Sequence, residues 1–175
     1  VVFRSVGRQE YATKDVRHIL FKVDESALDS EAETYEADLQ AAKDAAKTAA
    51  EDALAQWKAG EATEDSFAAL ANELSTDAGS NTNGGLYTKI YKNQMVTEFN
   101  DWCFDASRQS GDTGIVYGES SNYKGYHVMY FVGDDVPYWQ VQAENALRNA
   151  DTEAWLDGLL DSADVVQDAG MKHVG

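Results

Sequence analysis

The residues that could do chemistry are few and lie far apart in this chain. Three histidines, His18, His127 and His173, and one cysteine, Cys103, stand among 31 acidic residues. The sequence has no D-x-D-x-D-G loop, no H-E-x-x-H motif and no glycine loop that would cradle a phosphate. Cys103 has no histidine near it in sequence, and His173, close to the end, is interpreted as a surface residue. We therefore expect no metal site, no cofactor and no cysteine nucleophile.

Each remaining candidate also has a purely structural interpretation. His18 and His127 lie in predicted strands, where a single histidine is usually an interior residue with satisfied hydrogen bonds. Asp77 belongs to a Ser-Thr-Asp-Ala-Gly run that is typical of a turn. Met95 and Phe99 stand four residues apart on a predicted helix, a spacing found more often in a core than in a pocket. Residue types alone leave both interpretations open.

The two internal histidines are carried by the clearest predicted strands. Residues 16–23 are rich in β-branched and aromatic side chains, and residues 125–132 form a second such run. The small and polar residues 75–85 predict the loop that carries Asp77. Shorter strands are predicted at residues 86–91 and 111–117.

Helices are predicted between and after these strands. Residues 29–59 contain no Gly or Pro and end at Gly60, which predicts one long helix. Its apolar stripe is narrow and mostly alanine, so the helix should lie against the domain rather than in its centre. A second helix is predicted at residues 64–74, capped by Thr63 or Asp65. Further elements are a helix face at Met95, Phe99, Trp102 and Ala106, a helix in one or two pieces at residues 138–161, after Pro137, and a strand at residues 165–174.

The net charge of −17 limits the function classes that fit this chain. A surface that negative repels phosphate backbones and anionic lipid headgroups, so nucleic-acid binding and docking on a membrane are disfavoured. The sequence contains no stretch that predicts a membrane-spanning helix and no signal-peptide core. It begins with Val1 and not with Met, from which we expect a mature or trimmed chain whose targeting segment was removed.

A set of short motifs follows the strands and helices in a fixed order. They are R-H-I-L at 17–20, F-A-A-L-A-N-E-L-S-T-D at 67–77, S-N-T-N-G-G-L at 80–86, M-V-T-E-F at 95–99 followed by Phe104, and G-Y-H-V at 125–128. In this order and at these spacings the motifs resemble the parvulin family of peptidyl-prolyl cis/trans isomerases, and in particular the extracytoplasmic foldases of bacteria.

The resemblance implies an α+β fold with a small, antiparallel-dominated sheet surrounded by helices. It assigns residues 16–133 to the isomerase domain with residues 29–59 as a helical insert, and it leaves residues 1–15 as an N-terminal segment and 134–175 as a C-terminal helical extension. The catalytic residues that it implies are His18, Asp77 and His127. The apolar residues that it implies for the proline ring are Leu86, Met95, Phe99 and Phe104.

Two departures from the family pattern concern the pocket rim and the substrate. The family usually has Asp-Leu-Gly after the double glycine, whereas Gly85 is followed here by Leu86 and Tyr87. Phosphate-directed parvulins carry a basic cluster after the first strand, whereas this chain has Asp24 and Glu25 and further acidic residues. We therefore expect no recognition of phosphorylated Ser/Thr-Pro.

The implied function is prolyl isomerisation that assists the folding of exported proteins outside the cytoplasm. The partners would be unfolded or extended polypeptides that contain proline, and an apolar pocket would favour the twisted amide without covalent catalysis. One alternative is a chaperone or binding module that kept the fold and lost the activity. Another is that the segment after Pro137 packs with residues 1–15 in a larger chaperone domain. The sequence does not predict an oligomeric state.

Overall fold

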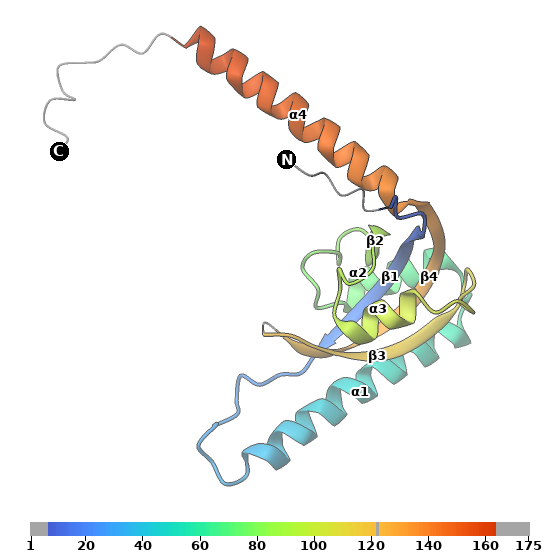
Figure 1. The fold of residues 1–175 in the computed structure, drawn as a ribbon. Coiled ribbons are helices and arrows are strands. Elements are labelled where there is room, and N and C mark those ends of the chain that lie inside the picture. Colours follow the sequence, from blue (N-terminus) through green and yellow to red (C-terminus); the bar gives the residue numbers. More distant parts are fainter. Residues whose placement is uncertain (1–6, 122, 164–175) are drawn as a thin grey trace, which may run out of the picture. The chain divides into compact units, whose positions relative to one another are not determined.

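The computed structural model describes residues 7–121 and 123–163 and has an α+β fold (Figure 1). The chain divides into two units, Val1–Tyr138 and Trp139–Gly175. The predicted order of strands and helices is confirmed. The elements are β1 (Ala12–Lys22), α1 (Tyr35–Ala59), α2 (Glu64–Leu74), β2 (Leu86–Ile90), α3 (Thr97–Cys103), β3 (Thr113–Glu119), β4 (Lys124–Pro137) and α4 (Tyr138–Ser162).

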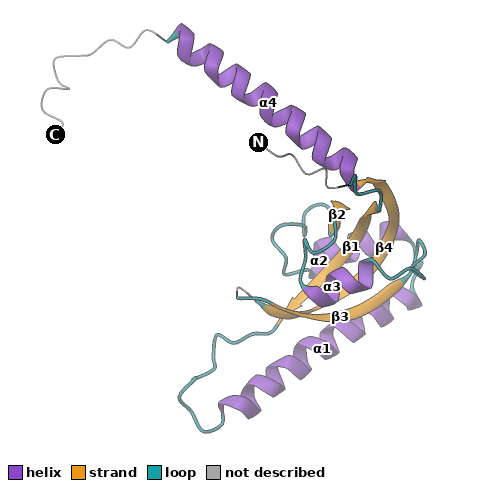
Figure 2. Cartoon of the chain, in the orientation of Figure 1, coloured by secondary structure: helices purple, strands orange, loops and turns teal. Residues whose placement is uncertain are grey.

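The four strands form one antiparallel sheet in the order β2-β1-β4-β3, with α1, α2 and α3 around it (Figure 2). The long central strands β1 and β4 pair so that Leu20 stands opposite His127 and His18 stands opposite Met129. Residues directly opposite each other in an antiparallel pair point to the same face of the sheet. His18 and His127 therefore occupy diagonal positions on one face.

The two faces of the sheet pack against different helices. One face is covered by α1 and α2, where the rings of Trp57 and Phe67 lie 5.8 and 5.3 Å from the ring of Tyr130. The other face is covered by α3, which contributes Phe99 and Cys103 to a second buried cluster. The alternation of strand side chains puts the histidines on the α3 face.

Helix α1 begins at Tyr35, so the prediction that it starts at residue 29 is wrong. The side chain of Asp29 accepts a hydrogen bond from the backbone N–H of Glu31 at 3.0 Å, and this local bond favours a turn over a helix. The C-terminal half of α1 contributes to the core more than its alanine-rich stripe predicted. Ala50 and Ala53 are buried there and let the helix approach the sheet.

Helix α2 has the predicted bounds, and Thr63 caps it. The Thr63 hydroxyl accepts from the backbone N–H of Ser66, and the Ser66 hydroxyl accepts from the backbone N–H of Thr63. Helix α4 is a single helix with no buried residue. The strand predicted at residues 165–174 lies outside the described residues. None of the helices in the described part of the chain is long and apolar enough to cross a membrane.

The strand pairs extend beyond the predicted domain bounds. Ala12 pairs with Pro137, and the backbone N–H of Tyr138 donates to the carbonyl of Tyr11 at 2.9 Å. The rings of Tyr11 and Tyr138 stack with centroids 5.4 Å apart. The division of the chain at residues 16 and 133 stays a prediction.

The Gly84-Gly85 turn brings β2 against β1 beside His18. Gly85 has φ +69°, and a Cβ built on it would lie 2.1 Å from the backbone carbonyl oxygen of His18. The backbone N–H of His18 donates to the carbonyl of Gly85 at 2.9 Å. Because this oxygen belongs to the backbone of a central strand, moving it away from an added Cβ would cost free energy.

We predict that Gly85→Ala destabilises the domain more than Gly111→Ala does. Gly111 has φ +90° and open space around the position of a Cβ, so its substitution carries only the backbone cost of about 1–2 kcal/mol. Gly85→Ala adds a steric cost of about 1–3 kcal/mol. Urea unfolding of both variants measures the difference, and equal losses of unfolding free energy would contradict this account of the turn.

Candidate functional site

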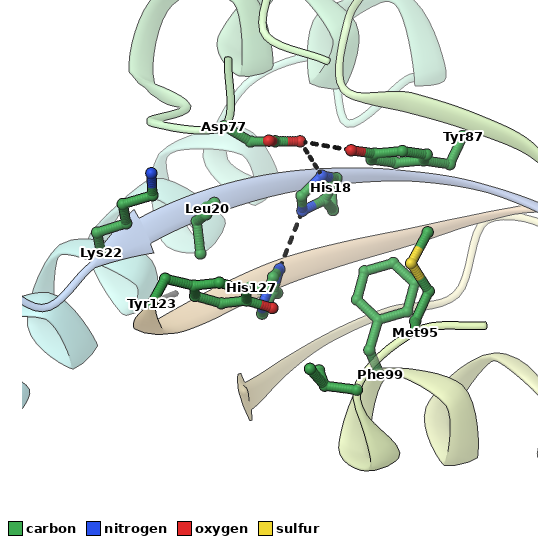
Figure 3. Close-up of a pocket in the computed structure, with 10 residues that line it drawn as sticks. His18, Leu20, Lys22, Asp77, Tyr87, Met95, Phe99, Tyr123 and His127 are labelled. Carbon is green, nitrogen blue, oxygen red and sulfur yellow. Dashed lines mark hydrogen bonds and ion pairs between the residues drawn. The ribbon is translucent and has the colours of Figure 1, made fainter. Parts of the chain in front are cut away.

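A cavity of about 200 Å³ opens on the α3 face of the sheet, beside the two histidines (Figure 3). The residues that line it come from β1, from the loop after α2, from β2, from the start of α3 and from β4 and the residue before it. They combine a polar cluster with an apolar wall. The lining residues are His18, Leu20, Lys22, Asp77, Tyr87, Met95, Val96, Phe99, Tyr123 and His127.

The two histidines form a buried pair at the centre of the sheet. The Nδ1 atoms of His18 and His127 are 3.0 Å apart, and both residues are 3% exposed. Their rings stack with centroids 5.2 Å apart and an angle of 30°. The ring of Phe99 lies nearly perpendicular to both histidine rings, at centroid distances of 5.6 and 5.4 Å. His18 and His127, at diagonal positions on neighbouring strands, thus form one hydrogen-bonded pair that packs against the ring of Phe99.

Asp77 joins this pair from the loop after α2. Its Oδ2 lies 3.0 Å from Nε2 of His18 and accepts hydrogen bonds from the hydroxyls of Ser80 at 2.6 Å and Tyr87 at 2.9 Å. Its Oδ1 accepts from the backbone N–H of Gly79 at 3.2 Å. The carboxylate is therefore held by four donor groups around one corner of the cavity.

Two further bonds tie the loop of Asp77 to β1. The backbone N–H of Thr76 donates to the carbonyl of Leu20 at 2.9 Å, and the backbone N–H of Leu20 donates to the Ser75 hydroxyl at 3.1 Å. The loop therefore follows β1 in a fixed register, which sets Asp77 beside His18.

The hydrogen bonds and burial set the protonation of the polar cluster. The bond from His18, with those from Ser80 and Tyr87, holds the pKa of Asp77 well below its ordinary value, although burial opposes this. Burial is the main cause that lowers the pKa of His127 to about 3. Burial and the neighbouring Asp77 raise the pKa of Tyr87 to about 12. At neutral pH Asp77 is ionised, whereas His127 and Tyr87 are neutral.

The apolar wall comes from the start of α3. Met95 and Val96 precede the helix, and Phe99, which is 2% exposed, lies in its first turn. Leu20 adds a side chain from β1. The cavity therefore offers an apolar surface next to an ionised carboxylate. Burial raises the pKa of the Cys103 thiol to about 12, so this thiol stays protonated.

No group of three His, Cys, Asp or Glu side chains that could hold a metal ion occurs within residues 7–121 and 123–163.

The family model Rotamase, described as a PPIC-type PPIase domain, matches residues 18–133. The chain belongs to the PPIC-type peptidyl-prolyl isomerase family. All the residues that line the cavity fall within the matched span.

Two solved structures resemble this PPIC-type chain. One is the peptidylprolyl isomerase PrsA from Bacillus cereus, with 24% identity and a TM-score of 0.47, covering 93% of this chain and 54% of that one. Another is from the SurA-like chaperones PEB4 and Cj1289 of Campylobacter jejuni, with 23% identity and a TM-score of 0.44, covering 90% of this chain and 56% of that one. The chain therefore spans about half the length of these structures. No curated protein sequence matches the chain.

The structure brings five of the seven proposed site residues of the PPIC-type domain to the cavity. Leu86 and Phe104 do not line it. On β2, Leu86 stands opposite Arg17 and Tyr87 stands opposite Val16, so strand alternation turns Tyr87 to the face of His18 and Leu86 to the other face. Phe104 follows α3 and packs edge-on against Tyr11 with centroids 5.9 Å apart. The residues that the structure does bring there are His18, Asp77, His127, Met95 and Phe99.

Sequence reasoning missed the two tyrosines of the site. Tyr87 could have been found from the alternation of β2, because the residue after Leu86 must point to the opposite face. Tyr123 precedes β4, and its hydroxyl lies 3.1 Å from Nε2 of His127. No motif predicts this contact, because it depends on how the chain enters β4.

We predict that the domain loses stability on acidification in two overlapping ranges, one for His127 and one for Asp77. His127 has a folded pKa of about 3 against about 6.5 in an unfolded chain, so the unfolded state binds the extra proton between these values. The stabilisation is present above about pH 6.5 and is lost as the pH falls toward 3, at no more than about 1.4 kcal/mol per pH unit. Asp77, whose pKa is also lowered, adds a loss below its ordinary value of 3.8.

Urea unfolding of the wild type, His127→Gln and Asp77→Asn between pH 7 and pH 3 measures this effect. His127→Gln should show a shallower dependence on pH in this range, because its side chain does not titrate. Asp77→Asn should retain the His127 dependence and lose stability less steeply below pH 4. Parallel pH curves for the wild type and His127→Gln would contradict a buried neutral His127.

Proposed function

We propose that the cavity binds the proline ring of an extended polypeptide and that the domain isomerises the X–Pro bond without a covalent intermediate. The observation that supports this most is the ionised Asp77, held by His18 and Tyr87, at the edge of an apolar wall made by Met95 and Phe99. The family membership supports a rotamase reaction at this domain.

The physical problem is the resonance of the amide. Rotation about the X–Pro bond has a barrier of ~18–20 kcal/mol, because it removes the partial double bond between carbon and nitrogen. In the planar form the carbonyl oxygen is more negative than in the twisted form. A fixed anion near that oxygen disfavours the planar amide, and an apolar wall removes water that would stabilise it. Asp77 and the α3 residues would supply these two effects together.

The charges around the cavity favour an unphosphorylated polypeptide over one that carries phosphate groups. Among the described residues, Lys22 is the one Lys or Arg side chain that lines the cavity, and Asp77 faces the same space. The segment after β1 is acidic, and Glu25 pairs with Lys124 at 2.7 Å. Recognition of phospho-Ser/Thr-Pro is therefore disfavoured. A role in the folding of exported proteins outside the cytoplasm stays a prediction from the parvulin resemblance.

We predict that Met95→Ala weakens catalysis and that Leu86→Ala does not. Met95 lines the cavity, whereas Leu86 lies on the opposite face of β2. Losing the contact of Met95 with a buried proline ring should lower kcat/KM by about 10- to 100-fold. A coupled assay with a proline-containing tetrapeptide measures both variants. An equal effect of the two substitutions would exclude this cavity as the binding site of the ring.

Asp77→Asn separates an isomerase from a chaperone that kept only the fold. The substitution keeps the size of the side chain and removes the charge, so we predict that isomerisation falls about 10- to 100-fold. Suppression of client aggregation, measured on the same protein, is the second readout. Wild-type activity no higher than that of buffer, with aggregation suppressed equally by the wild type and Asp77→Asn, would support the chaperone alternative instead.

A further inference from the structure

We infer that Tyr123 is a positioning residue, whose hydroxyl fixes the tautomers of both buried histidines so that every hydrogen bond of the cluster points toward Asp77. This inference rests on the proposed function for its effect on catalysis. The geometry that carries it is a continuous chain of contacts from the Tyr123 hydroxyl through His127 and His18 to the carboxylate. Figure 3 shows the part of this chain that runs from His127 through His18 to Asp77.

The direction of the chain is set at Asp77. An ionised carboxylate only accepts hydrogen bonds, so the Nε2 of His18, 3.0 Å from Oδ2, must carry a proton. Ser80, Tyr87 and the backbone of Gly79 also donate to this carboxylate. A second proton on His18 would sit on Nδ1, which faces His127 and adds no bond to Asp77. It would also place a cation on a side chain that is 3% exposed, so a single proton on Nε2 is the arrangement that costs less.

The same reasoning then assigns the second ring. A neutral His18 with its proton on Nε2 has a bare Nδ1, which must accept from Nδ1 of His127 at 3.0 Å. A neutral His127 with its proton on Nδ1 has a bare Nε2. That atom lies 3.1 Å from the Tyr123 hydroxyl, which must be the donor. The three groups then donate in one direction, from Tyr123 to His127 to His18 to Asp77.

The close packing around Nε2 of His127 explains why loss of the Tyr123 hydroxyl should have an effect. His127 is 3% exposed, and a Cβ at Gly118 on β3 would lie only 2.9 Å from Nε2. The nitrogen is thus closely packed, and loss of the Tyr123 hydroxyl would leave it as a buried acceptor without a donor. The preference of His127 for the tautomer with its proton on Nδ1 would then be smaller. Moving the proton of His127 to Nε2 would remove the donor to His18 and loosen the orientation of His18 against Asp77.

The test compares Tyr123→Phe with two matched tyrosine variants. Tyr87→Phe removes a donor to Asp77 but does not contact His127, and Tyr126→Phe alters a ring on the opposite face of β4. The ¹⁵N NMR signals of the histidine side chains, recorded near pH 7.5, identify which ring nitrogens carry protons. Prolyl isomerisation of a tetrapeptide gives kcat and KM for each protein.

In the wild type we expect His127 to be protonated on Nδ1 alone and His18 on Nε2 alone. Tyr123→Phe should convert His127 to a mixture of tautomers and lower kcat by about 2- to 10-fold, with KM changed less. Tyr87→Phe should leave the His127 tautomer as in the wild type. Tyr126→Phe should leave both the tautomer and the activity unchanged.

A wild-type His127 that is protonated on Nε2, or an unchanged tautomer in Tyr123→Phe, would overturn the inference. Unchanged kcat in Tyr123→Phe, with an active wild type, would overturn its catalytic part alone. An inactive wild type would instead count against the proposed function, and the NMR signals would still decide the role of Tyr123 in the histidine pair.

Discussion

The hydrogen bond between the two buried histidines is the interaction on which the site depends. Two imidazoles that are almost fully enclosed can pair only if one donates and the other accepts, and each then needs a suitable partner on its other side. Asp77 and Tyr123 provide these partners at the two ends. The fold supplies the pair through the register of β1 and β4, because a shift by one residue would turn one histidine to the opposite face.

The rest of the domain holds this pair and leaves space beside it. Helices α1 and α2 fill one face of the sheet, whereas α3 and the residues before it pack on the histidine face. There Phe99 of α3 and Met95, which precedes the helix, line the cavity. The glycine turn before β2 lets that strand approach β1 closely, and β2 in turn delivers Tyr87 to Asp77. An ionised group therefore sits beside an apolar wall with most of its hydrogen bonds already made.

The sequence predicted the parts of the site that follow from strand alternation and ordered motifs. The elements were found in the right order, and five proposed residues meet at one cavity. The placement of Leu86 was carried over from the family pattern, although the chain departs from that pattern after Gly85, and alternation puts Tyr87 there instead. The start of α1 and the contact of Tyr123 depend on local bonds and loop paths, which no periodic pattern encodes.

The central claim is that a proline ring enters this cavity and that its amide turns there. Exchange NMR of a proline-containing peptide, with a small amount of ¹⁵N-labelled protein present, tests it most directly. We expect exchange peaks between the cis and trans peptide signals, together with shifts of the backbone signals of His18, Asp77 and Met95. Exchange no faster than in buffer, or shifts confined to residues away from the cavity, would contradict the account.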